Sequence, residues 1–98
     1  MTRVIVPDEA AADVDAALDW YGRRDPILPL QFLEQLDLVL DRIQENPLQF
    51  PIIEGGVRRG LLRKFPFSVY FTTEHDDTAI VLAVVHQRRH PDSWKRER

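Results

Sequence analysis

Apolar residues recur every three or four positions in two segments of the chain, residues 8–22 and residues 30–45. This spacing predicts two amphipathic helices, because it places the apolar side chains along one side of an α-helix. The short segment between them contains a proline, which indicates a turn and therefore an antiparallel helical hairpin. The side chains expected to face inward are Val14, Ala17, Leu18 and Tyr21 in the first helix and Leu33, Leu36, Val39, Leu40 and Ile43 in the second.

The remaining segments have the patterns of β-strands. Residues 3–6 form a short run rich in valine and isoleucine, and residues 57–65 and 67–73 alternate between apolar and polar side chains. Residues 79–85 are seven consecutive apolar residues. A run this short without a polar side is typical of a strand buried on both faces, so we expect the strand over residues 78–89 to be central in the sheet.

The predicted order of elements is β-α-α-β-β-β, in a single domain that spans residues 1–98. Residues 49–56, which contain Pro51 and two adjacent glycines, are expected to form a loop. This order predicts an α+β fold in which the helical hairpin packs on one face of a small antiparallel sheet of three or four strands.

Charged residues follow the apolar run at its carboxyl end. Side chains alternate across a strand, so His86 and Arg88 are expected on the face that carries Ile80, Leu82 and Val84. Gln87 and Arg89 are expected on the opposite face, with Ala79, Val81, Ala83 and Val85. A rigid strand that delivers hydrogen-bond donors to the surface is suited to a binding or catalytic site.

Charge divides the chain into an acidic first part and a basic second part. The 98 residues have a net charge of -3, but residues 1–56 carry 11 acidic and 4 basic side chains, whereas residues 57–98 carry 5 acidic and 9 basic ones. Salt water screens charges beyond about 8 to 10 Å. The basic part is therefore able to face an anionic or acidic partner although the whole chain is acidic.

The composition limits the chemistry that we expect. There is no cysteine, so disulfides and thiolate metal sites are excluded, and a reducing cytoplasm is the expected compartment. No apolar run approaches the roughly 20 residues of a membrane span, and the start of the chain does not read as a signal peptide, so no membrane partner is expected. His86 and His90 lie roughly 13 Å apart along an extended strand, too far to share a metal, so neither a metal nor a cofactor is expected.

Three segments, in this order, resemble the RelE/ParE superfamily of toxins from bacterial toxin-antitoxin pairs. They are the Pro-Asp-Glu-Ala start of the first helix, residues 57–71 with Val-Arg-Arg and Phe-Pro-Phe-Ser-Val-Tyr-Phe, and residues 80–89, which read Ile-Val-Leu-Ala-Val-Val-His-Gln-Arg-Arg. The resemblance covers nearly the whole chain. It implies a helical hairpin on a curved antiparallel sheet, and a cognate antitoxin that wraps the toxin, forms a hetero-oligomer with it and blocks its action.

The superfamily has two branches that share a fold but not a mechanism. The RelE-like branch cleaves messenger RNA on the ribosome, which requires a base, an acid and cations near the scissile phosphate. The ParE-like branch poisons DNA gyrase and has no recognised hydrolytic site. The resemblance implies a basic target-binding surface made of Arg58, Arg59, Arg63, Lys64, Arg88 and Arg89.

Two departures from the RelE-like nucleases favour the ParE-like branch. The strand over residues 67–73 lacks the arginine that several of these nucleases place there, and Trp94 stands in place of their terminal tyrosine. His86 is the candidate base or acid if the chain is a nuclease, and otherwise a packed, hydrogen-bonded residue.

Whether the chain is an enzyme is therefore left open at this point. The leading hypothesis is a non-enzymatic toxin that inhibits growth by binding DNA gyrase. One alternative is a ribosome-dependent messenger endonuclease, with the ribosome and messenger RNA as partners. The other is an inactive relative that only binds an antitoxin.

Overall fold

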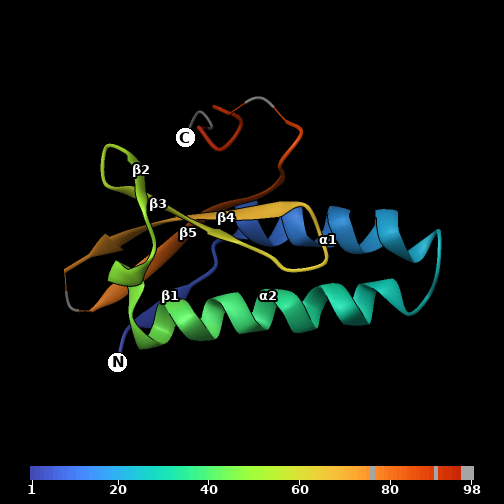
Figure 1. The fold of residues 1–98 in the computed structure, drawn as a ribbon, viewed down its shortest axis with the longest axis horizontal. Helices are drawn as coiled ribbons and strands as arrows, with labels where there is room; N and C mark the ends of the chain where they lie inside the picture. The colour runs from blue at the N-terminus through green and yellow to red at the C-terminus, as the bar shows by residue number, and fades with distance from the viewer. Residues whose placement is uncertain (76, 90, 96–98) are drawn as a thin grey trace.

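Two α-helices and five strands form the part of the chain that the structure describes. The structure is a computed structural model, and it describes residues 1–75, 77–89 and 91–95. The helices are α1 (Asp8–Gly22) and α2 (Leu28–Glu45), and a short 3-10 helix, Pro47–Gln49, follows them. The strands are β1 (Arg3–Ile5), β2 (Ile52–Glu54), β3 (Val57–Leu61), β4 (Phe67–Glu74) and β5 (Thr78–His86). The two helices run antiparallel as a hairpin on one side of the sheet (Figure 1).

The strands form one sheet in the order β1-β5-β4-β3-β2. β5 has β1 on one side and β4 on the other, which confirms the predicted interior position of this strand. The α+β class and the order of the predicted elements are also confirmed. The prediction of an antiparallel sheet of three or four strands is wrong in two respects: the sheet has five strands, and it is mixed, because β1 pairs in parallel with β5 while the other pairs are antiparallel. A parallel pairing needs a long connection, and the chain that leads from β1 to the other strands includes both helices.

β2 lies within the segment that was predicted to be a loop. Gly55 and Gly56, which follow it, have φ angles of 52° and 82°. Positive φ at both central residues is what a two-residue hairpin turn of this kind requires, and glycine adopts it without a steric penalty. The turn brings Ile52 opposite Arg58 of β3 and so adds a short edge strand to the sheet.

A β-bulge interrupts the alternation of side chains in β5. Tyr70 of β4 lies opposite Ala83, whereas the next residue, Phe71, lies opposite Val81. Leu82 is therefore the extra residue of the bulge, and the side chains on its two sides are out of phase by one position.

The bulge makes the predicted grouping of side chains on β5 wrong. After it, Val84 and His86 lie opposite Val69 and Phe67, on the face that the helices cover. Before it, Ile80 lies on the other face. His86 therefore shares its face with Val84, as predicted, but not with Ile80, because the prediction assumed strict alternation.

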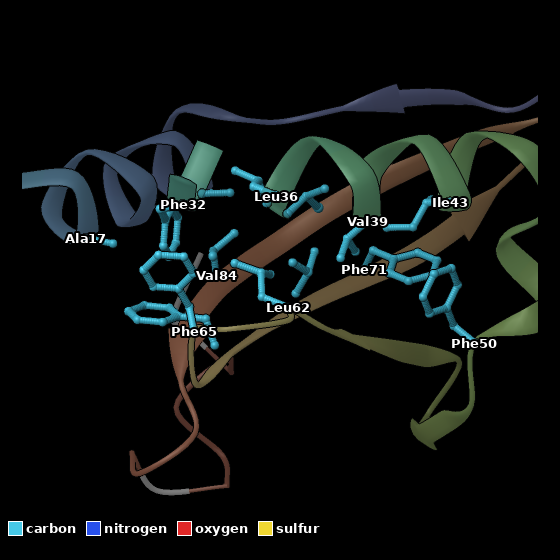
Figure 2. Close-up of a cluster of buried hydrophobic side chains, with 14 of the residues drawn as sticks. Ala17, Phe32, Leu36, Val39, Ile43, Phe50, Leu62, Phe65, Phe71 and Val84 are labelled. Atoms are coloured by element: carbon cyan, nitrogen blue, oxygen red, sulfur yellow. The ribbon is translucent and has the colours of Figure 1, made fainter. Parts of the chain in front are cut away.

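The main hydrophobic core lies between the helices and one face of the sheet (Figure 2). Phe32 of α2 is fully buried and lies edge-on to Phe65 and Phe67, with ring centroids 5.2 Å and 5.1 Å away. Edge-to-face packing of this kind adds to the stabilisation that burial of the rings provides. The predicted inward residues that pack in this core are Val14, Ala17, Leu18, Tyr21, Leu36, Val39, Leu40 and Ile43.

The prediction is wrong for Leu33, which is 36% exposed. α2 begins at Leu28, two residues earlier than expected, and its buried stripe starts at Phe32 and continues through Leu36 and Val39. Successive residues of an α-helix are separated by about 100°, so Leu33 falls on the flank of the stripe that Phe32 occupies.

The opposite face of the sheet carries a smaller apolar cluster, and no helix of the described chain covers it. Val57, Tyr70, Ala83 and Val85 are buried there, and Trp94 packs against them. The C-terminal segment, red in Figure 1, lies on the side of the sheet away from α2. Neither α1 nor α2 is long and apolar enough to cross a membrane, and these are the only α-helices among the described residues.

Candidate target-binding site

A hollow of about 400 Å³ opens on the face of the sheet that the helices leave uncovered. We call it the outer hollow. The strand register determines which side chains reach it, because residues opposite each other in a ladder point to the same face. Arg59 lies opposite Tyr70, and both line the hollow. Ser68, His86, Arg89 and Trp94 also line it.

The C-terminal segment forms one wall of the outer hollow. Trp94 stacks on Tyr70 with ring centroids 5.7 Å apart and planes inclined by 22°. Lys95 forms ion pairs with Glu54 of β2 at 2.5 Å and with Asp92 at 3.4 Å. The hydrogen bond to Glu54 is the main cause that raises the pKa of Lys95 and so keeps its ammonium charged. These exposed contacts tie the segment to the sheet and offset the two carboxylates at the rim.

Two arginines of the outer hollow, Arg59 and Arg89, form no ion pair in the described part of the chain. Among the described residues, no side-chain hydrogen bond engages either of them. Both side chains are exposed. Guanidinium groups in this state are able to form charge-assisted hydrogen bonds with a carboxylate or phosphate of a partner.

Arg58, the neighbour of Arg59, has a different environment. It lies opposite Phe71 and so points to the helix-covered face. There its Nη1 donates a hydrogen bond to the carbonyl oxygen of Phe50 at 2.6 Å and a longer one to that of Leu48 at 3.5 Å. These contacts fix the chain between the 3-10 helix and β2, so this guanidinium has a structural partner already.

The other three predicted basic residues lie outside the outer hollow. β3 ends at Leu61, four residues earlier than predicted, and Lys64 lies in the turn to β4 with a φ of 68°. Arg63 lines a different groove, beside Asp41 and Glu45 of α2. Arg88 comes after β5, which ends at His86 and not at Arg89 as expected. The structure therefore brings together two of the six predicted basic residues, Arg59 and Arg89.

His86 is packed and hydrogen-bonded at the end of β5. Its ring lies edge-on to Phe67, with centroids 5.2 Å apart. Its Nδ1 accepts a hydrogen bond from the backbone N–H of Arg88 at 3.0 Å. Because Nδ1 is an acceptor, the neutral ring carries its proton on Nε2. In this arrangement the Nδ1 lone pair is engaged by the backbone.

Comparisons with known proteins identify the family. A family model described as the ParE toxin of the type II toxin-antitoxin system parDE matches residues 4–91. The chain belongs to this toxin family. A solved structure described as the chromosomal ParDE toxin-antitoxin system from P. aeruginosa is similar to it, with a TM-score of 0.76 and 26% sequence identity over 88% of this chain and 96% of that one. A comparison with curated proteins gives no match.

The family confirms the resemblance to the RelE/ParE superfamily and its ParE-like branch. It also implies an antitoxin as a partner of this ParE-family chain, because the family is defined by the toxin-antitoxin system. The outer hollow suits binding better than chemistry, since it combines unpaired cations with an aromatic wall while the Ser68 side chain is buried.

The described part of this ParE-family chain contains no cluster of potential metal ligands. No group of three or more histidine, cysteine, aspartate or glutamate side chains there is arranged to hold a metal ion. His90, which was considered together with His86 as a metal ligand, lies outside the described residues.

Asp13 of α1 supports the end of β5, a role that was not predicted from the sequence. Its Oδ2 accepts a hydrogen bond from the backbone N–H of Val84 at 2.9 Å. The sequence feature that could have indicated this role is the position of Asp13 directly before Val14, beside the inward-facing stripe of α1. The stacking of Trp94 on Tyr70 had no comparable signal, because 23 residues and a strand separate the two rings in sequence.

Proposed function

We propose that this ParE-family toxin stops bacterial growth by binding DNA gyrase in the cytoplasm, and that a cognate antitoxin neutralises it. The match to the ParE toxin family over residues 4–91 carries the proposal. Gyrase as the target follows from the resemblance to the ParE-like branch, whose inhibition needs no hydrolytic site.

The outer hollow supplies the contacts that such binding needs. Arg59 and Arg89 gain charge-assisted hydrogen bonds only when a partner provides carboxylates or phosphates, so their interaction energy is available to the complex. Trp94, which stacks on the buried Tyr70, offers a rigid aromatic surface of the kind that dominates the binding energy of many protein interfaces. In this proposal the toxin acts by binding alone and breaks no covalent bond of the target.

His86 contributes through packing in this proposal. With Nδ1 engaged by the Arg88 N–H, the side chain supports the end of β5 and orients the residues that follow it. Replacement of His86 by glutamine retains a hydrogen-bonding side chain and should leave target binding largely intact.

Expression of the chain alone in bacteria is the first test. Growth should stop, and co-expression of the antitoxin should restore it. A folded chain that leaves growth untouched would instead support the alternative of an inactive relative that only binds an antitoxin.

Assays of supercoiling and of messenger cleavage distinguish a gyrase inhibitor from a ribosome-dependent endonuclease. The purified chain should inhibit gyrase supercoiling, and His86→Gln should change the half-inhibitory concentration by no more than about threefold, since no proton transfer is involved. Cleavage of ribosome-bound messenger, reduced by a factor of about 10² to 10⁴ in His86→Gln, would identify a nuclease and overturn the proposal.

A further inference from the structure

Residues 91–95 lie across the outer face of the sheet, and we call them the strap. Residues 91–94 line the outer hollow, and Trp94 packs against the buried apolar side chains of that face. The strap contains neither a strand nor a helix, so no regular backbone pairing holds it on the sheet. Its position therefore depends on a few contacts of its own side chains.

One ammonium group links the strap to the sheet. Nζ of Lys95 forms ion pairs with Glu54 of β2 at 2.5 Å and with Asp92 of the strap at 3.4 Å. It also lies 5.4 Å from the centroid of the Trp94 ring, which is within the range of a cation-π contact. Lys95 thus connects β2, the turn of the strap and the indole at one point.

The register of β2 directs Glu54 toward the strap. Glu54 lies opposite Val57, whose side chain belongs to the apolar cluster of the outer face, so both side chains point to that face. Gly55 and Gly56 form the tight turn that joins the two strands. The carboxylate that anchors the strap is therefore held in place by the hairpin of β2 and β3.

The attachment is weak in each of its parts and depends on their combination. The side chains of Lys95 and Glu54 are 42% and 55% exposed, and exposed ion pairs stabilise a structure only slightly. The stacking of Trp94 on Tyr70 supplies the apolar part of the attachment. A change that turns the ion pair into a repulsion should therefore release the indole, while the sheet and its core remain folded.

We propose that Glu54 and Lys95 are positioning residues, whose ion pair clamps the strap on β2 and holds Trp94 in the wall of the outer hollow for contact with gyrase. The clamp rests on the geometry alone, whereas its part in target binding rests on the proposed function. An indole that is already fixed loses little conformational entropy when a partner packs on it, so release of the strap should weaken binding.

Glu54→Lys separates positioning from general charge. It replaces the ion pair by a repulsion between two ammonium groups and makes the rim of the outer hollow more basic. If attraction to a basic surface alone governed binding, this variant should inhibit gyrase better than the wild type. Positioning predicts the opposite: half-inhibition of supercoiling should require at least about fivefold more protein, the factor expected when an aromatic side chain must be immobilised on binding.

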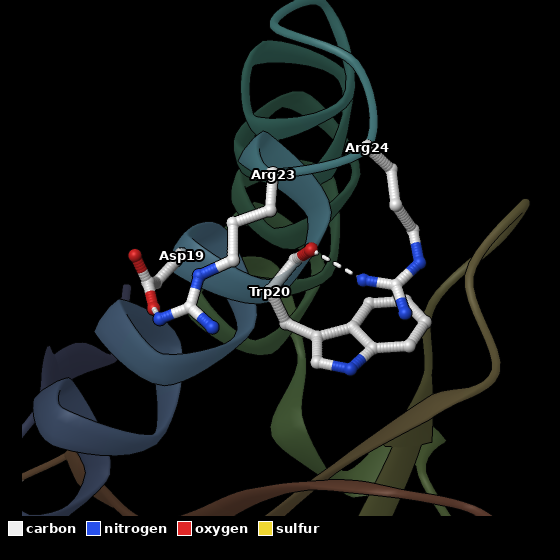
Figure 3. Close-up of polar contacts among 4 residues, drawn as sticks. All are labelled: Asp19, Trp20, Arg23 and Arg24. Atoms are coloured by element: carbon white, nitrogen blue, oxygen red, sulfur yellow. Dashed lines mark hydrogen bonds and ion pairs between the residues drawn. The ribbon is translucent and has the colours of Figure 1, made fainter.

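Asp19→Lys is the matched control. Asp19 forms an exposed ion pair with Arg23 on α1, at 2.6 Å and outside the outer hollow (Figure 3). The control variant makes the same change of charge and also sets two cations against each other, but it leaves the strap untouched. It should alter the half-inhibitory concentration no more than about twofold. An equal loss of inhibition in the two variants would overturn the positioning role.

The fluorescence of Trp94 tests the clamp without gyrase. Trp20, the only other tryptophan of the chain, lies on α1 with the guanidinium of Arg24 over its ring (Figure 3). Trp20→Phe removes this second signal and keeps an aromatic ring beside Arg24. In that background, Glu54→Lys should raise the quenching of Trp94 by acrylamide, and Asp19→Lys should leave it unchanged. Quenching that is the same in both variants would overturn the clamp.

A covalent link should replace the ionic one. The chain contains no cysteine, so a short bismaleimide reacts only at the two positions of a Glu54→Cys, Lys95→Cys variant. The crosslinked protein should inhibit gyrase as the wild type does, whereas the same variant capped with a monofunctional maleimide should require at least about fivefold more protein. Loss of inhibition on crosslinking would overturn the inference, because the strap would then have to open for the target.

Failure of this inference and failure of the proposed function give different results. If the wild type does not inhibit supercoiling but Glu54→Lys releases Trp94, the clamp is confirmed and gyrase is not the target. If the wild type inhibits supercoiling and Glu54→Lys inhibits equally well or better, the proposed function is supported and the positioning role is wrong.

Discussion

Arg58 and Arg59 are adjacent in β3 and point to opposite faces of the sheet, so removing their charges should have different consequences. Arg58 donates to the partly buried carbonyl of Phe50 at 2.6 Å, whereas the Arg59 side chain forms no ion pair with any described carboxylate. Loss of a hydrogen bond to a charged group leaves its partner unsatisfied, at a cost of about 1 to 3 kcal/mol. Arg58→Gln should lower the free energy of unfolding by this amount in urea, and Arg59→Gln should leave it unchanged. Equal destabilisation by both variants would contradict the assignment of Arg58 as the structural arginine.

Tyr21 should make the stability of the fold depend on alkaline pH. Burial raises the pKa of Tyr21 above its ordinary value, and Arg24 offsets part of this rise. The folded chain therefore keeps the phenol neutral at a pH where the unfolded chain ionises it. The resulting stability is fully present below the unfolded-state pKa of about 10 and is lost as the pH rises through the folded-state pKa.

Urea unfolding of the wild-type chain and of Tyr21→Phe tests this predicted loss of stability at alkaline pH. The free energy of unfolding of the wild type should fall relative to that of the variant between about pH 9 and about pH 11. A difference that stays constant over this range would show that the phenol titrates alike in both states.

Residue types and spacing predicted only part of the site. The exposure of Arg59 was predictable from alternation along its strand, and that of Arg89 from its place after the end of the apolar run. The engagement of Arg58 by Phe50 was not, since it depends on the 3-10 turn and on β2, which bring the Phe50 carbonyl back to β3. The hydrogen bond that fixes the tautomer of His86 depends likewise on the turn after β5.

At the scale of elements, periodicity predicted both helices and the three longer strands, and β-branched composition predicted β1, whereas β2, the bulge and the parallel pairing were not predicted. The bulge at Leu82 adds one residue to a strand that is apolar throughout, so no change of side-chain type marks it. β2 is too short to show a pattern, although the two glycines after it were a signal for a hairpin. The parallel pairing of β1 with β5 requires the long connection through both helices, which the composition of a three-residue strand does not reveal.

The phase of α2 provides a test at this scale. Phe32 is fully buried among aromatic rings, and its neighbour Leu33 is on the flank of the buried stripe. Phe32→Ala should lower the free energy of unfolding by about 3 to 5 kcal/mol, because it removes a large side chain and leaves a cavity. Leu33→Ala should cost less than about 1 kcal/mol. Thermal or urea unfolding measures both, and a larger effect at Leu33 would contradict the observed phase of the helix.

At the scale of the molecule, acidic and basic groups are segregated between the two layers. Glu34, Asp37, Asp41 and Glu45 are exposed on α2, whereas Arg59 and Arg89 lie at the outer hollow on the other face of the sheet. Long-range charge of this kind steers association, and salt screens it. We expect the rate of association with gyrase to fall as salt rises, which stopped-flow measurement of complex formation checks. A rate independent of salt would indicate that the basic face takes no part in the encounter.

The most direct test of the account is the concentration of the chain that half-inhibits gyrase supercoiling, compared between two charge-removing variants. Arg59→Gln with Arg89→Gln removes both unpaired arginines of the outer hollow, and Arg3→Gln removes an exposed arginine of β1 beside Thr78, at the other end of β5. The double variant should require at least about tenfold more protein, and Arg3→Gln no more than about twofold more, since only the former loses close charge pairs with the target. A double variant that inhibits as well as the wild type, or an equal loss in Arg3→Gln, would contradict the assignment of the outer hollow as the gyrase-binding surface.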